Sequence, residues 1–178
     1  MKKVKRLVIE IIFFAILIVI DQYTKSLAVT YLKDNPSIHI IKNALELYYL
    51  PNGNSGAAFG ILQGKQGFFV IIAIVVVMVI GFILFNMPFD AKYRIISILL
   101  TFIAAGGIGN MIDRFMQNYV VDFIYFSLIN FPIFNVADIY VSVATVVLAV
   151  YLIFVLKEDD IKILEEAIKA PFSKKKDL

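Results

Sequence analysis

Four long apolar runs constrain the fold of this chain more than any other feature. They cover about residues 7–27, 68–87, 95–112 and 139–156. The hydrocarbon core of a bilayer is about 30 Å thick, and a helix needs roughly 20 apolar residues to cross it. Hydrophobic residues make up 61% of the 178 positions, well above the roughly 45–50% that is usual for soluble domains. The sequence therefore predicts an all-α membrane protein with four transmembrane helices.

Basic residues at the ends of these runs predict the orientation in the membrane. They gather near both termini and in the short link between the second and third runs: Lys2, Lys3, Lys5, Arg6, Lys92, Arg94, Lys174, Lys175 and Lys176. Because basic segments stay in the cytoplasm, we expect both termini to be cytoplasmic. The basic start resembles a signal peptide, but the apolar run behind it is longer than a signal-peptide core. We therefore expect this run to be retained as the first span.

This topology places two segments on the outer side, about residues 33–66 and 113–138. In the first, alternating apolar residues at 38–41 and 45–50 precede a Pro-Asn-Gly-Asn turn, a pattern that predicts a small extracytoplasmic β element. The second is rich in Phe, Tyr, Ile and Leu over 123–134. This composition is typical of an interfacial segment, here between the third and fourth helices.

The C-terminal part, residues 157–178, follows the last span. Ile161, Leu164 and Ile168 have helical spacing, and Pro171 is expected to end the helix before a run of lysines. The segment is predicted to be a cytoplasmic surface helix with a basic tail that faces anionic lipid. The chain shows no internal repeat, so residues 1–178 are predicted to form one domain.

Ionisable side chains within or beside a span are costly and mark candidate functional sites. Asp21 and Lys25 share one helix face near the outer end of the first run, either as a neutralising pair or as a substrate contact. Asn110, Asp113 and Arg114 follow a run of small residues that favours close helix packing. These three side chains either form a polar cap or belong to a site.

Two further carboxylates differ in their expected surroundings. Asp122 lies among valine and phenylalanine residues, so burial is expected to raise its pKa. If Asn135 caps the fourth helix, Asp138 occupies its third position, where backbone N–H groups and the helix dipole favour the ionised form. Asp138 can belong to a cap and to a site together. A protonated and an ionised carboxyl can divide the acid and base roles around a water, as in aspartic proteases.

Composition excludes other kinds of catalytic site. The chain has no cysteine, which excludes a thiolate metal site and a cysteine nucleophile. Its single histidine, His39, cannot build a histidine zinc site, and we expect no metal and no cofactor. Gly53 to Gly56 match the Gly-x-Ser-Gly pattern of rhomboid-type serine proteases, but His39 precedes Ser55, whereas that family takes its base from a later helix. These glycines are better explained by a turn that lets backbone approach an extended substrate.

Five short motifs follow one another between about residues 8 and 157. They are Asp21-Gln22-Tyr23-Thr24-Lys25, Asn54-Ser55-Gly56-Ala57-Ala58-Phe59, Gly109-Asn110-Met111-Ile112-Asp113-Arg114, Val120-Val121-Asp122-Phe123 and Phe131-Pro132-Ile133-Phe134-Asn135-Val136-Ala137-Asp138. Together they resemble the motifs of the bacterial lipoprotein signal peptidases, or signal peptidase II, which are intramembrane aspartyl proteases. One departure is Ala105-Gly106-Gly107, where the family usually has Gly-Gly-Ala. The exchange is among small residues and concerns packing.

The resemblance implies a catalytic pair formed by Asp122 and Asp138. It also implies that further residues line or support the site: Asn54, Gly56, Asn110, Arg114, Asn135, Asp21 and Lys25. We add Asp113 to this set. The implied substrate is a prolipoprotein whose cysteine carries diacylglycerol, cut just before that cysteine. The implied location is the bacterial cytoplasmic membrane, with the active site at its outer face. Membrane lipid is then a partner, nucleic acid is not, and a monomer is expected.

Two other functions fit parts of the pattern. A proton-coupled transporter component would also carry carboxylates in the membrane, but it predicts them at several depths. Here Asp113, Asp122 and Asp138 gather at one expected face, and the second and fourth runs are uncharged. A non-catalytic scaffold of the same shape differs only in lacking activity.

Of the two paired carboxylates, Asp122 is the expected holder of the shared proton, because its surroundings are more apolar.

Overall fold

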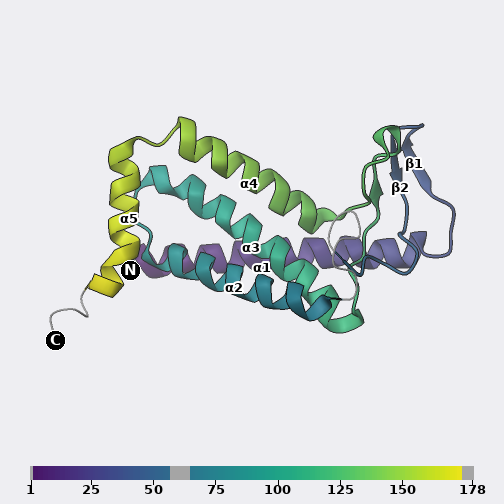
Figure 1. Ribbon diagram of the computed structural model, residues 1–178, viewed down its shortest axis with the longest axis horizontal. Helices are drawn as coiled ribbons and strands as arrows, with labels where there is room; N and C mark the ends of the chain where they lie inside the picture. The colour runs from purple at the N-terminus through teal and green to yellow at the C-terminus, as the bar shows by residue number, and fades with distance from the viewer. Residues whose placement is uncertain (1, 57–64, 174–178) are drawn as a thin grey trace.

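A computed structural model describes residues 2–56 and 65–173 of the chain (Figure 1). Two sequence features lie outside the described residues: the motif positions Ala57, Ala58 and Phe59, and the lysine run at 174–176. The elements in chain order are α1 (Lys2–Leu32), β1 (Ile38–Ile41), β2 (Leu45–Leu47), α2 (Gln66–Asn86), α3 (Ala91–Gln117), β3 (Ile124–Tyr125), a 3-10 helix (Ser127–Ile129), α4 (Val136–Phe154) and α5 (Glu158–Ser173).

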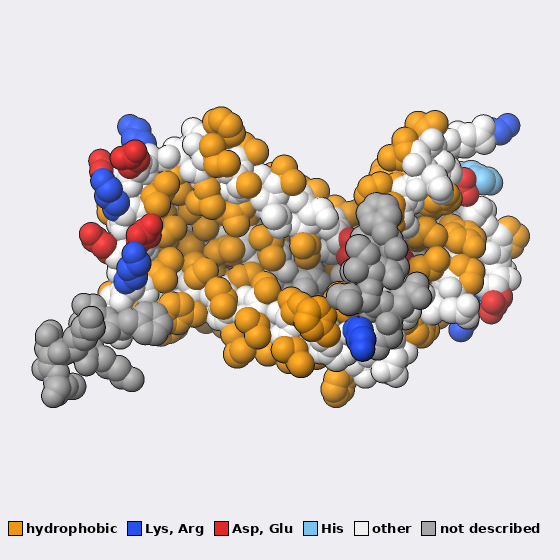
Figure 2. Space-filling view, in the orientation of Figure 1, with side chains coloured by type: hydrophobic (Ala, Val, Ile, Leu, Met, Phe, Trp, Pro, Cys, Tyr) orange, Lys and Arg blue, Asp and Glu red, His pale blue; other side chains and the backbone are white. Residues whose placement is uncertain are grey.

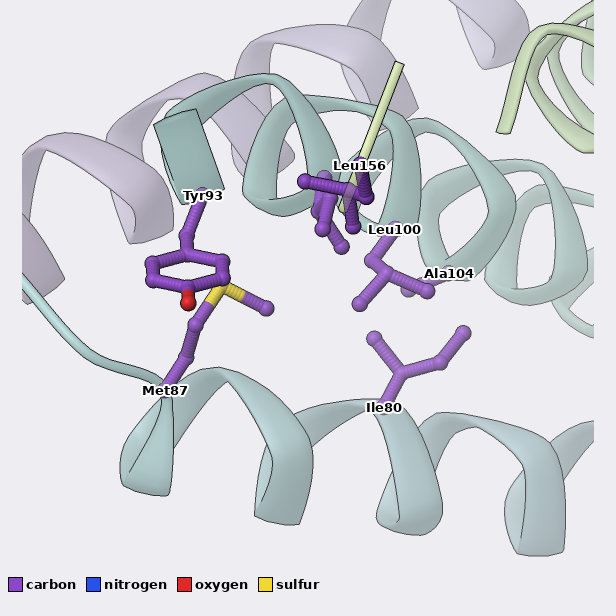
Figure 3. Close-up of a cluster of buried hydrophobic side chains, with 7 residues drawn as sticks. Ile80, Met87, Tyr93, Leu100, Ala104 and Leu156 are labelled. Atoms are coloured by element: carbon purple, nitrogen blue, oxygen red, sulfur yellow. The ribbon is translucent and has the colours of Figure 1, made fainter. Parts of the chain in front are cut away.

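Helix α3 lies at the centre of the helical bundle, because α1, α2 and α4 all pack against it. It contributes more buried residues than the other helices described, and several of them are small. At the α5 end of the bundle, apolar side chains of α2, α3 and the segment after α4 form a buried cluster (Figure 3). Its members are Ile80, Met87, Tyr93, Ile96, Leu100, Ala104 and Leu156.

Three helices within the described residues, α2, α3 and α4, are long and apolar enough to cross a membrane. Figure 2 shows hydrophobic side chains over the middle of the bundle and charged side chains gathered towards its two ends. So much exposed apolar surface belongs in lipid rather than in water. Three of the four predicted spans are thus present as helices that could cross a membrane. Helix α1, which corresponds to the first predicted span, runs alongside the others in the bundle (Figure 1).

A small antiparallel sheet of three strands, in the order β1-β2-β3, stands at the end of the bundle opposite α5 (Figure 1). Strands β1 and β2 confirm the predicted β element, and Ile38 pairs with Leu47. Strand β3 comes from the segment between α3 and α4 and was not predicted, because two residues are too short for a sequence pattern. Its pairing with β2 ties this segment to the N-terminal half of the chain.

Two predicted helix ends differ from the structure. Helix α3 continues beyond residue 112 to Gln117 and ends at Asn118, which adopts a left-handed conformation with φ of 64°. Asp113 and Arg114 therefore lie within the helix rather than in the link after it, because their side chains find partners inside the protein. The prediction that Pro171 ends the last helix is wrong, since α5 runs to Ser173. A proline in the last turn of a helix removes only one backbone hydrogen bond.

Small residues bring α3 and α4 together, which leads to a prediction about stability. A Cβ atom on Gly106 would lie 2.5 Å from the carbonyl oxygen of Ala137 in α4. Since a backbone atom cannot yield without separating the helices, we expect Gly106→Ala to destabilise the protein by about 1–3 kcal/mol. A Cβ on the neighbouring Gly107 would have nothing within 4 Å. Gly107→Ala is therefore the control and should melt no lower than the wild type; equal Tm values for the two variants would contradict the packing argument.

Candidate active site

The start of α4 fixes one of the two carboxylates. Asn135 is the N-cap residue, and its side-chain oxygen accepts a hydrogen bond from the backbone N–H of Asp138 at 3.0 Å. In return, Asp138 Oδ2 accepts from the backbone N–H of Asn135 at 3.1 Å. This reciprocal capping box satisfies N–H groups that the first turn leaves free. The predicted cap is confirmed, and it holds the Asp138 carboxylate at the mouth of the apolar helix.

Asp122 is held by backbone pairing with the loop that follows β2. Its carbonyl oxygen accepts from Leu50 N at 3.1 Å, and two residues earlier Val120 exchanges a pair of 2.9 Å backbone bonds with Asn54. The Asn54 side chain then donates from Nδ2 to Asp122 Oδ2 at 2.8 Å. Asp122 is only 1% exposed. Burial, followed by the nearby charge of Asp138, raises the pKa of Asp122 to about 7, in the predicted direction.

Side-chain amides link the two carboxylates. Asn135 donates from Nδ2 to Asp122 Oδ1 at 2.7 Å, and Asn110 donates from Nδ2 to Asp138 Oδ1 at 2.8 Å. With the bonds from Asn54 and from the Asn135 backbone, each of the four carboxylate oxygens accepts one N–H. Hydrogen bonds of this kind orient a carboxylate and stabilise its charge. The structure thus brings Asp122 and Asp138 into one network, as the sequence predicted.

Both carboxylates open onto one cavity of about 460 Å³. Asn54, Gly56, Asn110 and Arg114 line it with them, and apolar side chains form most of the remaining wall. The apolar lining comes from the interfacial segment and from α4: Phe131, Pro132, Ile133, Phe134, Ile139 and Val143. An apolar cavity with a few converging polar groups is the usual form of a ligand site. This one suits an apolar substrate that presents a polar bond.

Arg114 connects the cavity to the loop after β2. Its guanidinium donates to the carbonyl oxygen of Gly56 at 3.1 Å and to that of Asn110 at 3.3 Å. The guanidinium carbon also lies 4.8 Å from the centroid of the Phe69 ring. Arg114 thereby fixes the backbone of Gly56 at the cavity wall. A planar guanidinium is suited to this role because its donors have a fixed geometry.

Asp21, Lys25 and Asp113 form a buried ion cluster behind the cavity. Lys25 Nζ lies 2.9 Å from Asp21 Oδ2 and 2.9 Å from Asp113 Oδ2. It also donates to Asn110 Oδ1 at 3.0 Å, which joins the cluster to the carboxylate network. Asp21 and Lys25 do not line the cavity. The structure therefore favours the neutralising pair over a substrate contact, and it adds Asp113 as a second partner of Lys25.

The sequence interpretation missed two polar residues of the helices. Gln22 donates from Nε2 to the carbonyl oxygen of Gly109 at 3.1 Å and to Asp113 Oδ1 at 3.0 Å, bridging α1 and α3. Its position next to Asp21 in the first motif was the available signal. Glu10 lies in the first apolar run, where it pairs with Arg6 at 2.7 Å and accepts from Ser97 of α3. No group of side chains among residues 2–56 and 65–173 is arranged to hold a metal ion.

Comparison with known proteins identifies the family. The sequence model of Signal peptidase (SPase) II matches residues 13–154. The chain belongs to the signal peptidase II family. It is therefore an aspartic-type membrane peptidase, and the resemblance seen in the five motifs is confirmed. The match runs from within α1 to the end of α4 and includes every residue that lines the cavity.

Relatives of this signal peptidase II match it over most of their length. The lipoprotein signal peptidase of Brevibacillus brevis is 43% identical over 134 residues, which is 75% of this chain and 87% of that protein. That of Clostridium tetani is 42% identical over 153 residues, 84% of this chain and 94% of that protein. A solved bacterial membrane enzyme has a TM-score of 0.70 at 33% identity, covering 80% of this chain and 85% of its own. None of these matches supports the transporter alternative.

Proposed function

We propose that this signal peptidase II cuts diacylglyceryl-modified prolipoproteins just before the lipidated cysteine, with Asp122 and Asp138 as the catalytic pair. One observation carries the assignment of the pair: two carboxylates with different surroundings open onto the same apolar cavity. The relatives named lipoprotein signal peptidase support the substrate class. A lipidated peptide needs an apolar cavity, and hydrolysis of its amide bond needs an acid and a base.

The two carboxylates have complementary roles in this proposal. Asp138 is ionised in this proposal, and its carboxylate accepts one N–H from Asn110 and one from Asn135; it takes a proton from the attacking water. Asp122 carries the shared proton and donates it to the carbonyl oxygen of the scissile bond. Collapse of the tetrahedral intermediate then breaks the C–N bond: the leaving amine receives the proton held by Asp138, and one hydroxyl of the intermediate returns a proton to Asp122 as the new carboxyl group forms. No covalent enzyme intermediate forms, and this division of labour needs two carboxyl groups with separated proton affinities.

The membrane arrangement belongs to the same proposal. Helix α1 is the fourth span beside α2, α3 and α4, both termini face the cytoplasm, and the protein acts as one domain and as a monomer. Support comes from two basic residues in the first turn of α3, Lys92 and Arg94, because Lys92 pairs with Asp160 of α5 and so marks this end of the bundle. Helix α4 begins near the sheet at the opposite end (Figure 1). The active site then lies at the outer face, where water is available.

The surroundings of the cavity suit the proposed substrate. A signal peptide crosses the membrane as an apolar helix and must be extended where it is cut. Strand β1 lies at the edge of the sheet and offers backbone groups for binding an extended chain by strand addition. Exposed Leu128 and Ile129, in the link between α3 and α4, offer apolar contact to the lipid surface. The acyl chains of the substrate can then remain among the membrane lipids.

Reconstitution with a purified prolipoprotein tests the function. The protein in lipid vesicles is expected to release one signal peptide whose mass places the cut immediately before the cysteine. The control substrate is the same prolipoprotein without diacylglycerol, which we expect to be processed at least about tenfold more slowly. Absence of cleavage, cleavage at another bond, or equal rates for the two substrates would contradict the proposal.

The raised pKa of Asp122 predicts the pH dependence of the reaction. Because Asp122 donates a proton in the proposal, activity should be highest while it is protonated and should fall as the pH rises through about 7. The profile of kcat/KM between about pH 5 and about pH 9, measured at constant salt, checks this. Activity that climbs steadily across this interval would exclude Asp122 as the acid.

A further inference from the structure

The ammonium group of Lys25 uses all three of its N–H donors inside the protein. Two of them meet Asp21 Oδ2 and Asp113 Oδ2, each at 2.9 Å, and the third meets Asn110 Oδ1 at 3.0 Å. Only 4% of the Lys25 side chain is exposed. A lysine ammonium donates and never accepts. The atom of Asn110 that faces Lys25 must therefore be the amide oxygen rather than the amide nitrogen.

This orientation decides what Asn110 presents to Asp138. With its oxygen held at Lys25, the amide nitrogen of Asn110 is left to donate to Asp138 Oδ1, at 2.8 Å. If the amide were flipped, its nitrogen would face the N–H donors of Lys25 and its oxygen would face a carboxylate oxygen. Both contacts would be repulsive, and an unpaired buried polar group is costly.

A second donor holds the same oxygen. Asn135 Nδ2 donates to Asn110 Oδ1 at 3.1 Å, while Asn135 Oδ1 is committed to the backbone N–H of Asp138 at 3.0 Å. The orientation of Asn135 is thus set by the backbone of α4. The orientation of Asn110 depends on Lys25 and on this longer amide contact, and hydrogen bonds from charged donors are the stronger kind.

We propose that Lys25 is a positioning residue that fixes the Asn110 amide and thereby directs an N–H donor at the Asp138 carboxylate. The inference rests on the proposed roles of Asp122 and Asp138. Ion pairing alone would involve only the contacts with Asp21 and Asp113. The third N–H of Lys25 links α1 to a reacting group that Lys25 does not touch.

The charges around Asp138 define how this can be tested. They are Asp21 and Lys25 on α1, Asp113 and Arg114 on α3, and Asp122 in the link. Removing Lys25 alone would leave Asp21 and Asp113 buried without a counter-charge, which can unfold a protein. The trio of Asp21, Asp113 and Lys25 has a formal charge of −1 (−1 −1 +1). The double substitution Lys25→Met with Asp113→Asn keeps −1, because only Asp21 remains charged.

The experiment compares Lys25→Met and Lys25→Gln, both in the Asp113→Asn background. The two side chains are neutral and similar in size, but only glutamine can donate an N–H to Asn110 Oδ1. We expect kcat of the Met variant to fall about 10- to 100-fold below that of the background, with KM changed less than about twofold. The acid-side limb of its pH–rate profile should move to higher pH, because a carbonyl oxygen can then face Asp138. The Gln variant should recover part of the kcat lost in the Met variant. Its acid-side limb should lie at the same pH as that of the Asp113→Asn background.

Equal kcat values and equal pH profiles for the Gln and Met variants would overturn the role of Lys25. A fall in activity caused only by a higher KM would overturn it too. The Tm in detergent shows whether the Met variant folds. If it does not fold, the role of Lys25 is overturned when the acid-side limb of the Gln variant's pH–rate profile differs from that of the Asp113→Asn background. Lys92→Met is the control, since Lys92 pairs with Asp160 at the other end of the bundle and should leave kcat and the profile unchanged. This test is separate from the test of the catalytic pair. The catalytic pair would be contradicted if Asp122→Asn cleaved the substrate at the wild-type rate.

Discussion

Asp122→Asn and Asp138→Asn should each abolish prolipoprotein cleavage, with kcat lowered at least about a thousandfold. An asparagine at 138 cannot take a proton from water, and an asparagine at 122 cannot give one to the carbonyl oxygen. Each change also places an amide N–H₂ group where the wild-type carboxylate accepts two N–H donors, for example from Asn54 and Asn135 at Asp122. The reacting groups are thus lost and the network around them is mismatched. Single-turnover cleavage of a diacylated prolipoprotein in vesicles gives the rates.

A carboxylate far from the site supplies the control for these variants. Asp159 lies on α5, its side chain is 90% exposed, and Asp159→Asn should cleave at the wild-type rate. Membrane insertion and Tm should be measured for all three variants, because a network mismatch can also lower stability. Full processing by either Asp122→Asn or Asp138→Asn, with the protein folded, would disprove the proposed catalytic pair.

Asn135→Ala should give the second-largest loss, about 100- to 1,000-fold in kcat. The Asn135 side chain is fully buried and has two functions: it donates to Asp122 and to Asn110, and it caps α4 through the Asp138 N–H. Alanine removes both functions, so Tm should fall as well, by the equivalent of about 1 kcal/mol for the lost cap. Thermal melting and cleavage rates measured on the same preparation report the two effects.

Asn135→Ser separates the two functions of this residue. A serine hydroxyl is a good N-cap acceptor, but it is too short to reach Asp122. We expect Asn135→Ser to recover most of the stability of the wild type and to remain as inactive as Asn135→Ala. If serine restored cleavage along with stability, Asn135 would matter to this enzyme only as a cap.

Features that depend on nearby residues were predictable from the sequence. The capping box at α4 follows from an asparagine placed three positions before Asp138 at the start of an apolar run. Strands β1 and β2 follow from alternating apolar residues on either side of Asn43, which adopts a positive φ of 59° in the turn between them. The raised pKa of Asp122 follows from its apolar neighbours. In each case the sequence within a few residues contains the physical cause.

Features that depend on distant residues were not predictable. Helix α3 passes Asp113 and Arg114 without ending, because Lys25 of α1 and the backbone of Gly56 satisfy these polar groups. Without those partners, two charged residues after an apolar run look like the end of a span. Strand β3 exists only because it pairs with β2. The bond from Lys25 to Asn110 joins residues 85 positions apart, and no local pattern indicates it.

The hydrogen bonds to the two carboxylates also bear on the order in which the site forms during synthesis and membrane insertion. The donors come from the loop after β2, from α3 and from the N-terminus of α4, and Asp138 itself belongs to α4. A ribosome produces these segments in order, and the last of them completes the site. A nascent chain in which only the first helices are inserted therefore lacks Asp138, the two N–H donors of Asn135 and the α4 wall of the cavity. We therefore expect proteolytic activity only after α4 has been inserted.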